Sequence, residues 1–464
     1  MGVLKKANRN PSHYVKLSAM TLSMLLVFTG CSGGAAKPNT GTAGQSDSNK
    51  GTEAAKSAAK TGSDEKVTIE YWQYVYPAKV DLINALIDDF QKKHPNITVK
   101  HTNFPYDQYN EKVAALVPAG KGPDVINLYY GWLPKYVASG YLQPLPDSAF
   151  SEETIKKEFF PFVETAKLNG KYYAIPTAVR TLALFYNKDL FAKAGLDPAK
   201  PPATWEELVS YGKKLTEKDS KGQYVVEGLA WQPNSQLHHW YRDALVYQAG
   251  GKDLSDDRRK ILWGDSPAGF EAFKYLIDLS LVHNLGTKDF YNDDITAFKG
   301  SHAAMNIDGS FQLGGLKKDA PNLNYAIAPL PSYKEKATQV SFWANAITKG
   351  VQGKKLEAAT QFLNYLTSKE VQEQWVEKVG ELPAKKEVAL QDKYVKDEKL
   401  GPFIQQLSYA HAHFFVDEKL ERDYFVEAVD QVVLNKIPYE KAYQELVQKT
   451  QKLYDDYWTK QDKK

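Results

Sequence analysis

Alternating apolar and polar positions define a series of strands and helices after residue 65. Val67–Trp72 has the two-residue period of a strand, and Val80–Lys93 places its apolar residues on one helical face. Ile97–Phe104 predicts a second strand, Tyr109–Leu116 an amphipathic helix, and Asp124–Leu128 a third strand. Strands that alternate with helices in this order are typical of a parallel sheet.

A second α/β unit is predicted after Tyr186. A capping box opens a helix over Thr204–Leu215, a Ser-Pro pair opens another over Ser266–Leu281, and Val225–Ala230 reads as a strand. From Lys354 onward the pattern is mostly helical. The folded part, about residues 65 to 464, exceeds the size at which a single core usually splits. We therefore predict an α/β protein with two lobes.

The first 64 residues follow a different pattern. Four basic residues and no acid precede the uncharged stretch Leu17–Gly30, which is the layout of a secretory signal and is shorter than a membrane span. The stretch ends at Cys31, the only cysteine, in a Phe-Thr-Gly-Cys run that resembles the lipobox of bacterial lipoproteins. This resemblance implies cleavage before Cys31 and attachment of acyl chains to it. Residues 32–64 contain no aromatic or branched aliphatic residue and are expected to form a flexible tether.

Removal of residues 1–30 changes the charge of the chain. The full sequence has 59 basic and 56 acidic side chains, and four of the basic ones lie in the leader, so the net charge falls from +3 to about −1. A nucleic-acid partner or a polybasic membrane contact loses its support. With Cys31 lipidated, no thiol remains for a disulfide or a metal site.

Four segments resemble the family 1 extracellular solute-binding proteins, the carbohydrate receptors of ABC importers. They are Gly122–Leu145, Gly170–Thr216 (with YNKDLF, AGL and TWEEL), Phe298–Leu313, and Ala346–Trp375 followed by GELPA at Gly380–Ala384. The resemblance implies a non-catalytic, monomeric receptor of periplasmic-binding-protein type II fold, which binds a sugar between two hinged lobes and delivers it to permease subunits. Lobe one is expected at 65–183 plus 338–386 and lobe two at 184–337 plus 387–464, with crossings near Leu182–Lys188 and Ile327–Tyr333. The lipid would hold the receptor on the outer face of the cytoplasmic membrane.

Aromatic residues near strand ends are the candidate sugar contacts. Rings cover the apolar faces of a sugar, and ligands of open α/β sheets bind beyond the carboxyl ends of the strands. From strand ends we expect contacts from Trp72, Tyr74, Tyr129, Tyr130, Trp132 and Trp231. The resemblance adds Asp308, Phe311, Trp343 and Tyr424, with Phe311 at the place of a stacking aromatic. Packing in the core is the alternative for each of these rings.

Arg180 is the cation expected in the cleft, because it precedes the first crossing. It could bind hydroxyls or a ligand carboxylate, or it could be structural and pair with Asp308 or Asp243.

Other chemistries have weaker signals. Metalloprotease, phosphate-loop, serine-hydrolase and dinucleotide motifs do not occur, and the pairs His238–His239 and His411–His413 lack a third ligand at metal-binding spacing, so neither metal nor cofactor is expected. Two alternatives stay open. A surface glycoside hydrolase or lyase would need two facing carboxyl groups, and a ferric-ion receptor would use the adjacent Tyr129 and Tyr130.

Overall fold

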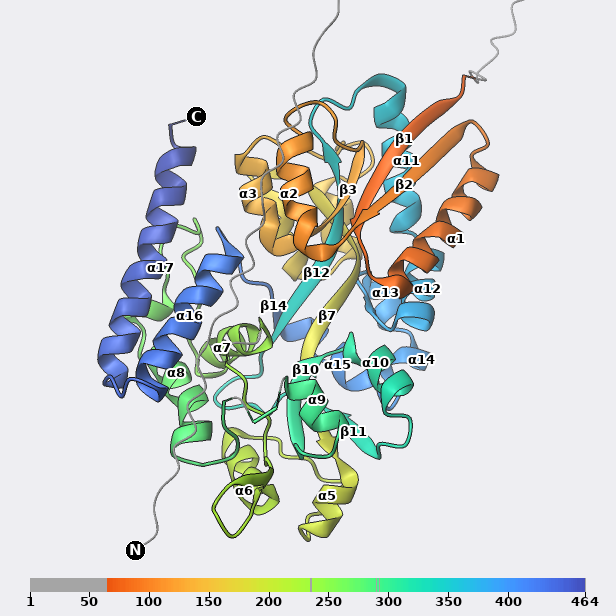
Figure 1. The fold of residues 1–464 in the computed structure, drawn as a ribbon. Helices are drawn as coiled ribbons and strands as arrows, with labels where there is room; N and C mark the ends of the chain where they lie inside the picture. The colour runs from red at the N-terminus through yellow and green to blue at the C-terminus, as the bar shows by residue number, and fades with distance from the viewer. Residues whose placement is uncertain (1–64, 234–235, 289, 292, 464) are drawn as a thin grey trace, which may run out of the picture. The chain divides into compact units, whose positions relative to one another are not determined.

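The computed structural model describes residues 65–463 apart from 234, 235, 289 and 292, and these residues belong to one compact unit (Figure 1). The predicted leader, Cys31 and the tether over 32–64 lie outside the described residues. The side chains of residues 106, 107 and 236–239 are likewise outside them. Among the described residues, no helix is long and apolar enough to cross a bilayer.

The predicted strand–helix repeat forms the first part of the main sheet. Strand β1 (Val67–Tyr74) lies between β2 (Ile97–Phe104) and β3 (Val125–Tyr129), and both pairs are parallel. Helix α1 (Pro77–Lys93) connects β1 to β2, and α2 (Tyr106–Leu116) connects β2 to β3. The predicted order and parallel pairing are confirmed.

Two long strands continue this sheet into the rest of the protein. Strand β12 (Thr338–Thr348) pairs antiparallel with β3, and β7 (Ala174–Asn187) pairs antiparallel with β12. The first part of β7, up to Thr181, pairs with β12, and the part from Leu182 onward pairs with β10 (Met305–Gly309) and β11 (Tyr325–Ala328). A single strand therefore belongs to two groups of strands, and the change falls at Thr181–Leu182.

The main sheet has the order β10-β7-β12-β3-β1-β2, and four shorter or branching strands join it. Helices α1, α11 (Gly353–Leu366) and α12 (Lys369–Val379) pack against one another, and α16 (Glu418–Val433) packs on α17 (Tyr439–Gln461) (Figure 1). The remaining strands are β4 (Leu142–Gln143), β5 (Lys167–Leu168), β6 (Lys171–Tyr172), β8 (Glu217–Lys218), β9 (Tyr224–Val226), β13 (Leu382–Pro383) and β14 (Ala410–His411).

The other helices lie between these strands and over the C-terminal third, and the sequence predicts those over 205–215 and 267–281 and those after residue 354. Those before β12 are α3 (Leu133–Ala138), α4 (Glu152–Glu158), α5 (Lys188–Lys193), α6 (Trp205–Leu215), α7 (Gln236–Gln248), α8 (Pro267–Leu281), α9 (Asp294–Lys299) and α10 (Gln312–Asp319). Those after β12 are α11 (Gly353–Leu366), α12 (Lys369–Val379), α13 (Lys386–Ala389), α14 (Asp392–Val395), α15 (Gly401–Ile404), α16 (Glu418–Val433) and α17 (Tyr439–Gln461). Short 3-10 turns occur at Tyr130–Trp132, Pro161–Ala166, Trp263–Asp265 and Leu407–Tyr409.

The two predicted helix starts are confirmed, whereas the predicted strand Val225–Ala230 is mostly absent. Thr204 accepts a hydrogen bond from the Glu207 amide at 3.1 Å, and Ser266 caps α8 in the same way. Strand β9 ends at Val226. Beyond it, backbone hydrogen bonds to residues 302–305 form only an isolated bridge at Glu227, and Gly228 passes so close to α6 that a Cβ there would lie 2.1 Å from the Gly212 carbonyl oxygen.

Candidate ligand-binding site

Four of the predicted aromatic residues meet where β1, β3 and β12 lie side by side. The Tyr74 ring stacks on Trp343 with centroids 4.0 Å apart. Trp343 also contacts Trp132 at 5.4 Å and Tyr129 at 6.0 Å, and Trp132 lies 5.8 Å from Tyr129. Aromatic pairs at these separations attract one another beyond the area they bury.

The strand register explains why these residues converge. Tyr74 and Tyr129 are the last residues of the parallel strands β1 and β3, so their rings emerge at the same edge of the sheet. Trp343 of β12 is the direct partner of Tyr129 in the antiparallel pairing. Trp132 follows within one short turn. The chain thus assembles the rings at the carboxyl ends of the parallel strands, where open α/β sheets bind ligands.

Trp240 of α7 is a fifth ring at this place, and the sequence analysis missed it. Its indole stacks with Tyr129 at 6.2 Å, and it is buried. Its Nε1 has no hydrogen-bond acceptor among the described residues, and the same holds for Nε2 of Gln73 in β1. A buried donor without an acceptor costs free energy, and a bound ligand or water often supplies the missing acceptor. We call Tyr74, Tyr129, Trp132, Trp240 and Trp343 the aromatic cluster.

Lys79, Arg180 and Glu381 form a charged triad beside the aromatic cluster. The Glu381 carboxylate accepts from Lys79 Nζ at 2.8 Å and from Arg180 Nε at 2.6 Å. Arg180 also hydrogen-bonds Tyr74, and the Lys79 ammonium lies 5.5 Å from the Tyr74 ring and 5.6 Å from the Trp343 ring. The triad therefore contacts the stacked pair directly.

Burial and charge set the protonation of these groups. Burial raises the pKa of Glu381, but the charges of Arg180 and Lys79 outweigh it and hold the pKa below its ordinary value. Burial lowers the pKa of Lys79 to about 7, although Glu381 opposes the shift. Burial raises the pKa of Tyr74 to about 12, so its hydroxyl stays neutral.

Arg180 has a different partner from those the sequence suggested. Neither Asp308 nor Asp243 pairs with it: Asp243 pairs with the neighbouring Arg242, and Asp308 accepts from the Gly309 amide at 2.7 Å. Glu381 lies 201 residues from Arg180 along the chain, so sequence proximity gave no hint of the pair. The outer face of Arg180 lies 4.9 Å from the ring of Phe311, which is half-buried at the start of α10.

Asp308 is fully buried on β10, where burial raises the pKa of its carboxyl to about 8. The carboxyl is therefore neutral near pH 7. It can donate or accept a hydrogen bond, but it contributes little charge to its surroundings.

The other predicted aromatic residues have no ring contact with Trp343, although Tyr130 lies edge-on to Tyr129 with centroids 4.9 Å apart. Trp72 packs edge-on against Phe104 at 5.0 Å, and Trp231 is buried with its Nε1 donating to the Leu276 carbonyl at 2.9 Å. Tyr130 stacks on Phe342 and accepts from Gln339, and Tyr424 lies on α16 beside Lys449. These surroundings are those of core and interhelical packing.

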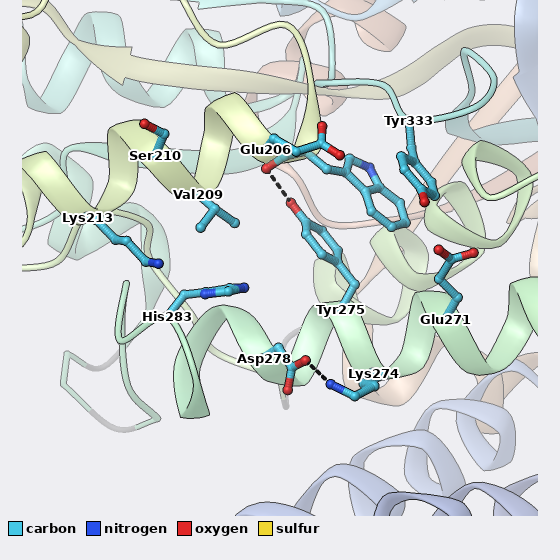
Figure 2. Close-up of a pocket in the computed structure, with 11 residues that line it drawn as sticks. Glu206, Val209, Ser210, Lys213, Glu271, Lys274, Tyr275, Asp278, His283 and Tyr333 are labelled. Carbon is cyan, nitrogen blue, oxygen red and sulfur yellow. Dashed lines mark hydrogen bonds and ion pairs between the residues drawn. The ribbon is translucent and has the colours of Figure 1, made fainter.

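A separate cavity of about 590 Å³ lies between α6 and α8 (Figure 2). Tyr275 and Tyr333 flank the Trp205 ring at 4.0 and 4.5 Å, and Lys274 pairs with Asp278. The cavity is lined by Trp205, Glu206, Val209, Ser210, Lys213, Glu271, Lys274, Tyr275, Asp278, His283 and Tyr333. None of the predicted contacts is among them, so this cavity and the aromatic cluster are different places.

Comparison with known proteins identifies the family. The model of the bacterial extracellular solute-binding proteins matches residues 85–402, more than half of the chain. The chain belongs to this family. A maltotriose-binding protein of Pyrococcus abyssi is 27% identical to this solute-binding protein over 363 residues, which cover 76% of this chain and 74% of the relative. The sn-glycerol-3-phosphate-binding periplasmic protein of Shigella dysenteriae is 27% identical over 345 residues, or 69% of this chain and 74% of the relative.

A solved structure shows the fold of this solute-binding protein. The cyclic α-maltosyl-1,6-maltose binding protein of Arthrobacter globiformis matches it with a TM-score of 0.75 at 22% identity, over 84% of this chain and 100% of the other. The predicted fold class, a two-lobed α/β binding protein, is confirmed. Strand β7 pairs with both groups of strands within that fold.

Proposed function

We propose that this protein is the substrate-binding component of an ABC importer and binds an oligosaccharide at the aromatic cluster. The observation that carries the proposal is the convergence of five rings from β1, β3, the short turn after β3, β12 and α7 in a member of a solute-binding family. A Tyr or Trp ring covers about 150 to 250 Å² while its polar tip stays available for a hydroxyl. Rings with polar tips suit a polyhydroxylated ligand.

The names of two similar proteins support a sugar as the ligand of this protein. One relative binds maltotriose, and the Arthrobacter structure belongs to a protein that binds a cyclic maltosyl-maltose. We propose lobes at 65–183 plus 338–386 and at 184–337 plus 387–464, which close on the ligand and present it to permease subunits. The change of partners along β7 at Thr181–Leu182 supports the first boundary.

The aromatic cluster, Phe311 and Arg180 are the proposed ligand contacts. Trp240 supplies a ring from α7 that faces Tyr129, and Phe311 supplies one from the start of α10 beside Arg180. Trp72, Tyr130, Trp231, Asp308 and Tyr424 are assigned to packing or hydrogen bonding within the protein.

The charge state of Glu381 supports a non-catalytic role. A glycosidase needs a proton-donating acid and a second carboxylate. Glu381 is the acid in the triad, and its two cations keep its pKa low, so it is a poor proton donor. We expect mass spectrometry to show an unchanged oligosaccharide after long incubation with the protein, and cleaved products would contradict this role.

A ferric-ion site is disfavoured by the tyrosines themselves. Burial raises the pKa of Tyr130 well above its ordinary value, and its hydroxyl bonds Gln339. In the part of the chain that the structure describes, no three His, Cys, Asp or Glu side chains are grouped to hold a metal. We expect ferric iron to produce no tyrosinate colour, and a charge-transfer band would favour the metal receptor instead.

We propose that Cys31 anchors the protein by lipid to the outer face of the cytoplasmic membrane. The lipobox-like run and the tether-like composition of 32–64 support this. Stable anchoring needs more than one acyl chain. We expect Cys31→Ser to release the protein into the medium with its sugar affinity intact.

A ligand screen tests the proposed function. Thermal unfolding of the mature chain is measured with mono- and oligosaccharides, neutral and acidic, and hits are confirmed by calorimetry. A ligand at about 100 times its dissociation constant adds roughly 2.7 kcal/mol of stability. Trp343→Ala should abolish a hit, whereas Lys213→Gln, which lines the separate cavity of Figure 2, should not. A complete absence of hits would contradict the proposal, and loss of a hit in Lys213→Gln alone would move the site to that cavity.

A further inference from the structure

The charged triad beside the aromatic cluster does not balance its own charge. Lys79 and Arg180 share one carboxylate, that of Glu381, and all three residues are buried or nearly so. Among the side chains that the structure describes, the other ionisable groups that act on the triad are Tyr74 and Tyr76. Burial raises the pKa of both tyrosines, so neither supplies a negative charge. With Lys79 protonated, the triad carries one excess positive charge.

Ring faces are the remaining neighbours of the Lys79 ammonium. The rings of Tyr74, Tyr76, Trp343 and Trp375 lie 5.5 to 5.9 Å from its nitrogen. Such contacts stabilise a cation, but they bring no opposite charge. A buried ammonium with a shared carboxylate loses its proton readily, and here burial lowers the pKa of Lys79 to about 7.

Arg180 is the member of the triad that is most accessible to a ligand. Its side chain is 15% exposed, against 3% for Lys79 and Glu381. One face lies over Phe311 and one edge is bonded to Glu381. A guanidinium has five N–H donors and stays protonated at any ordinary pH. Asp308 precedes Phe311 on the same segment, but it pairs with its own neighbours and burial raises its pKa to about 8.

We propose that Arg180 forms a subsite for an anionic group, so that the preferred ligand is an acidic saccharide. The inference rests on the proposed function and narrows its ligand class. The anion bonds the exposed edge of Arg180 and supplies the negative charge that the triad lacks. Lys79 does not contact the anion; it is a positioning residue that acts through Glu381, the carboxylate it shares with Arg180. A sugar carboxylate and a sugar phosphate share this chemistry.

Matched ligand pairs test the subsite. Calorimetry compares galactotriose with trigalacturonate, maltotriose with its glucuronate-terminated analogue, and glycerol with sn-glycerol 3-phosphate. We expect the acidic member of at least one saccharide pair to bind tenfold tighter or better, with a preference that weakens as salt rises. Preference for the phosphate pair alone would move the ligand to phosphate esters, which overturns the acidic-sugar assignment. Tight binding of neutral sugars with no acidic preference overturns the subsite and leaves the proposed function standing. No binding of any sugar contradicts both.

Substitutions distinguish a direct contact between Arg180 and the anion from a general effect of the protein's net charge on binding. Arg180→Gln should remove the acidic preference, and Arg180→Lys should keep part of it. Lys213→Gln removes the same charge at the separate cavity and should leave the preference unchanged.

Proton uptake tests the role of Lys79 without any substitution. Near pH 7.5, arrival of an anion should return a proton to Lys79, so the calorimetric enthalpy depends on the ionisation enthalpy of the buffer. We expect uptake of up to one proton with the acidic ligand and much less with a neutral one. The same dependence should vanish in Lys79→Met. Equal uptake for acidic and neutral ligands, or uptake that persists in Lys79→Met, would contradict this role.

Discussion

Two buried charged groups in this protein differ in how completely their neighbours satisfy them. The charged triad of Lys79, Arg180 and Glu381 has two cations and one carboxylate. The histidine network, defined by Asp253, His413, Glu421 and Tyr454, has the opposite ratio, because His413 bonds Asp253 at 3.1 Å and Glu421 at 3.0 Å.

The histidine network is saturated with hydrogen bonds. The Leu254 amide donates to Asp253 at 2.7 Å, and Tyr247 donates to the same carboxylate. The Val416 amide and Tyr454 donate to Glu421, each at 3.3 Å. Burial lowers the pKa of His413, but the charges of Asp243 and Glu421 outweigh it and raise the pKa to about 10. Its imidazolium is thus a fixed part of the fold.

The comparison shows how a structural charge differs from one suited to a ligand. In the histidine network, backbone amides donate to both carboxylates, and His413 is 1% exposed. Within the described part of the chain, ring faces and no second carboxylate surround the cations of the triad, and Arg180 is partly exposed beside Phe311. An unsatisfied charge next to unpartnered donors and stacked rings is a physical signature of a binding site.

Breaking the network should have the largest effect on stability. His413→Gln leaves the buried carboxylate of Glu421 and the partly exposed carboxylate of Asp253 without their cation, which is expected to cost about 3 to 5 kcal/mol. Urea unfolding measures the loss, and ligand affinity should change less than twofold. His302→Gln is the control, because His302 has a longer contact, 3.3 Å, to the Val225 carbonyl. Equal stability of His413→Gln and the wild type would contradict the assigned role.

The pH dependence of stability should have opposite signs in the two groups. The pKa of His413 is about 10 when folded, against 6.5 for free histidine, so its contribution is full below pH 6.5 and is lost towards pH 10. The pKa of Lys79 is about 7 when folded, against 10.5, so folding becomes more favourable as pH rises between these values. Each titrating proton changes the slope of the unfolding free energy against pH by at most about 1.4 kcal/mol per pH unit.

Unfolding of two variants over pH 6.5 to 10 separates these signs. The stability difference between wild type and His413→Gln should shrink as pH rises, and that between wild type and Lys79→Met should shift in favour of the wild type. Slopes of the same sign would show that the pairing of one group has been misread.

Removal of the ring over Arg180 should weaken binding moderately. Phe311→Ala is expected to reduce ligand affinity at least roughly tenfold, about 1.4 kcal/mol, without unfolding the protein. Calorimetry with the best ligand from the screen measures it. Phe270→Ala is a matched control, because Phe270 is a half-buried ring that packs against Tyr443. Unchanged affinity in Phe311→Ala would remove this residue from the site.

The smallest effect is expected at Trp72. Its ring packs on Phe104, and its backbone carbonyl accepts from Tyr109 at 3.0 Å, so a smaller ring keeps the local contacts. Trp72→Phe should change ligand affinity less than twofold in the same calorimetric assay. A tenfold loss would extend the site along β1 beyond Tyr74.

Local patterns predicted much of this fold because they act over a few residues. The bounds of β2 agree with the alternation at Ile97–Phe104, and the caps at Thr204 and Ser266 depend on neighbouring residues alone. Tyr74 and Tyr129 were identifiable because a strand end is visible in sequence, and in the structure each of them contacts Trp343. Whether they bind a ligand remains a prediction.

Contacts between distant segments could not be predicted in this way. Lys79 lies in the first turn of α1 and reads like a solvent-facing lysine, but it is 2% exposed because α12, β12 and Glu381 cover it. Trp240 sits in an amphipathic helix, where an aromatic residue usually packs in the core. Strand ends in the sequence identified Tyr74 and Tyr129. They did not identify Lys79 or Trp240, because the positions of these residues depend on packing between segments that are distant in the sequence.

The long strand β12 has a consequence for how the chain is made. It pairs with β3 and β7, which lie about 160 to 220 residues earlier, so both strands are complete long before their shared partner is synthesised. Until residue 348 has emerged, β3 has an open edge that can pair with another chain. Folding should therefore be slow and sensitive to truncation: chains that stop before Thr338 are expected to aggregate, whereas those that end after β12 have the main sheet available for assembly.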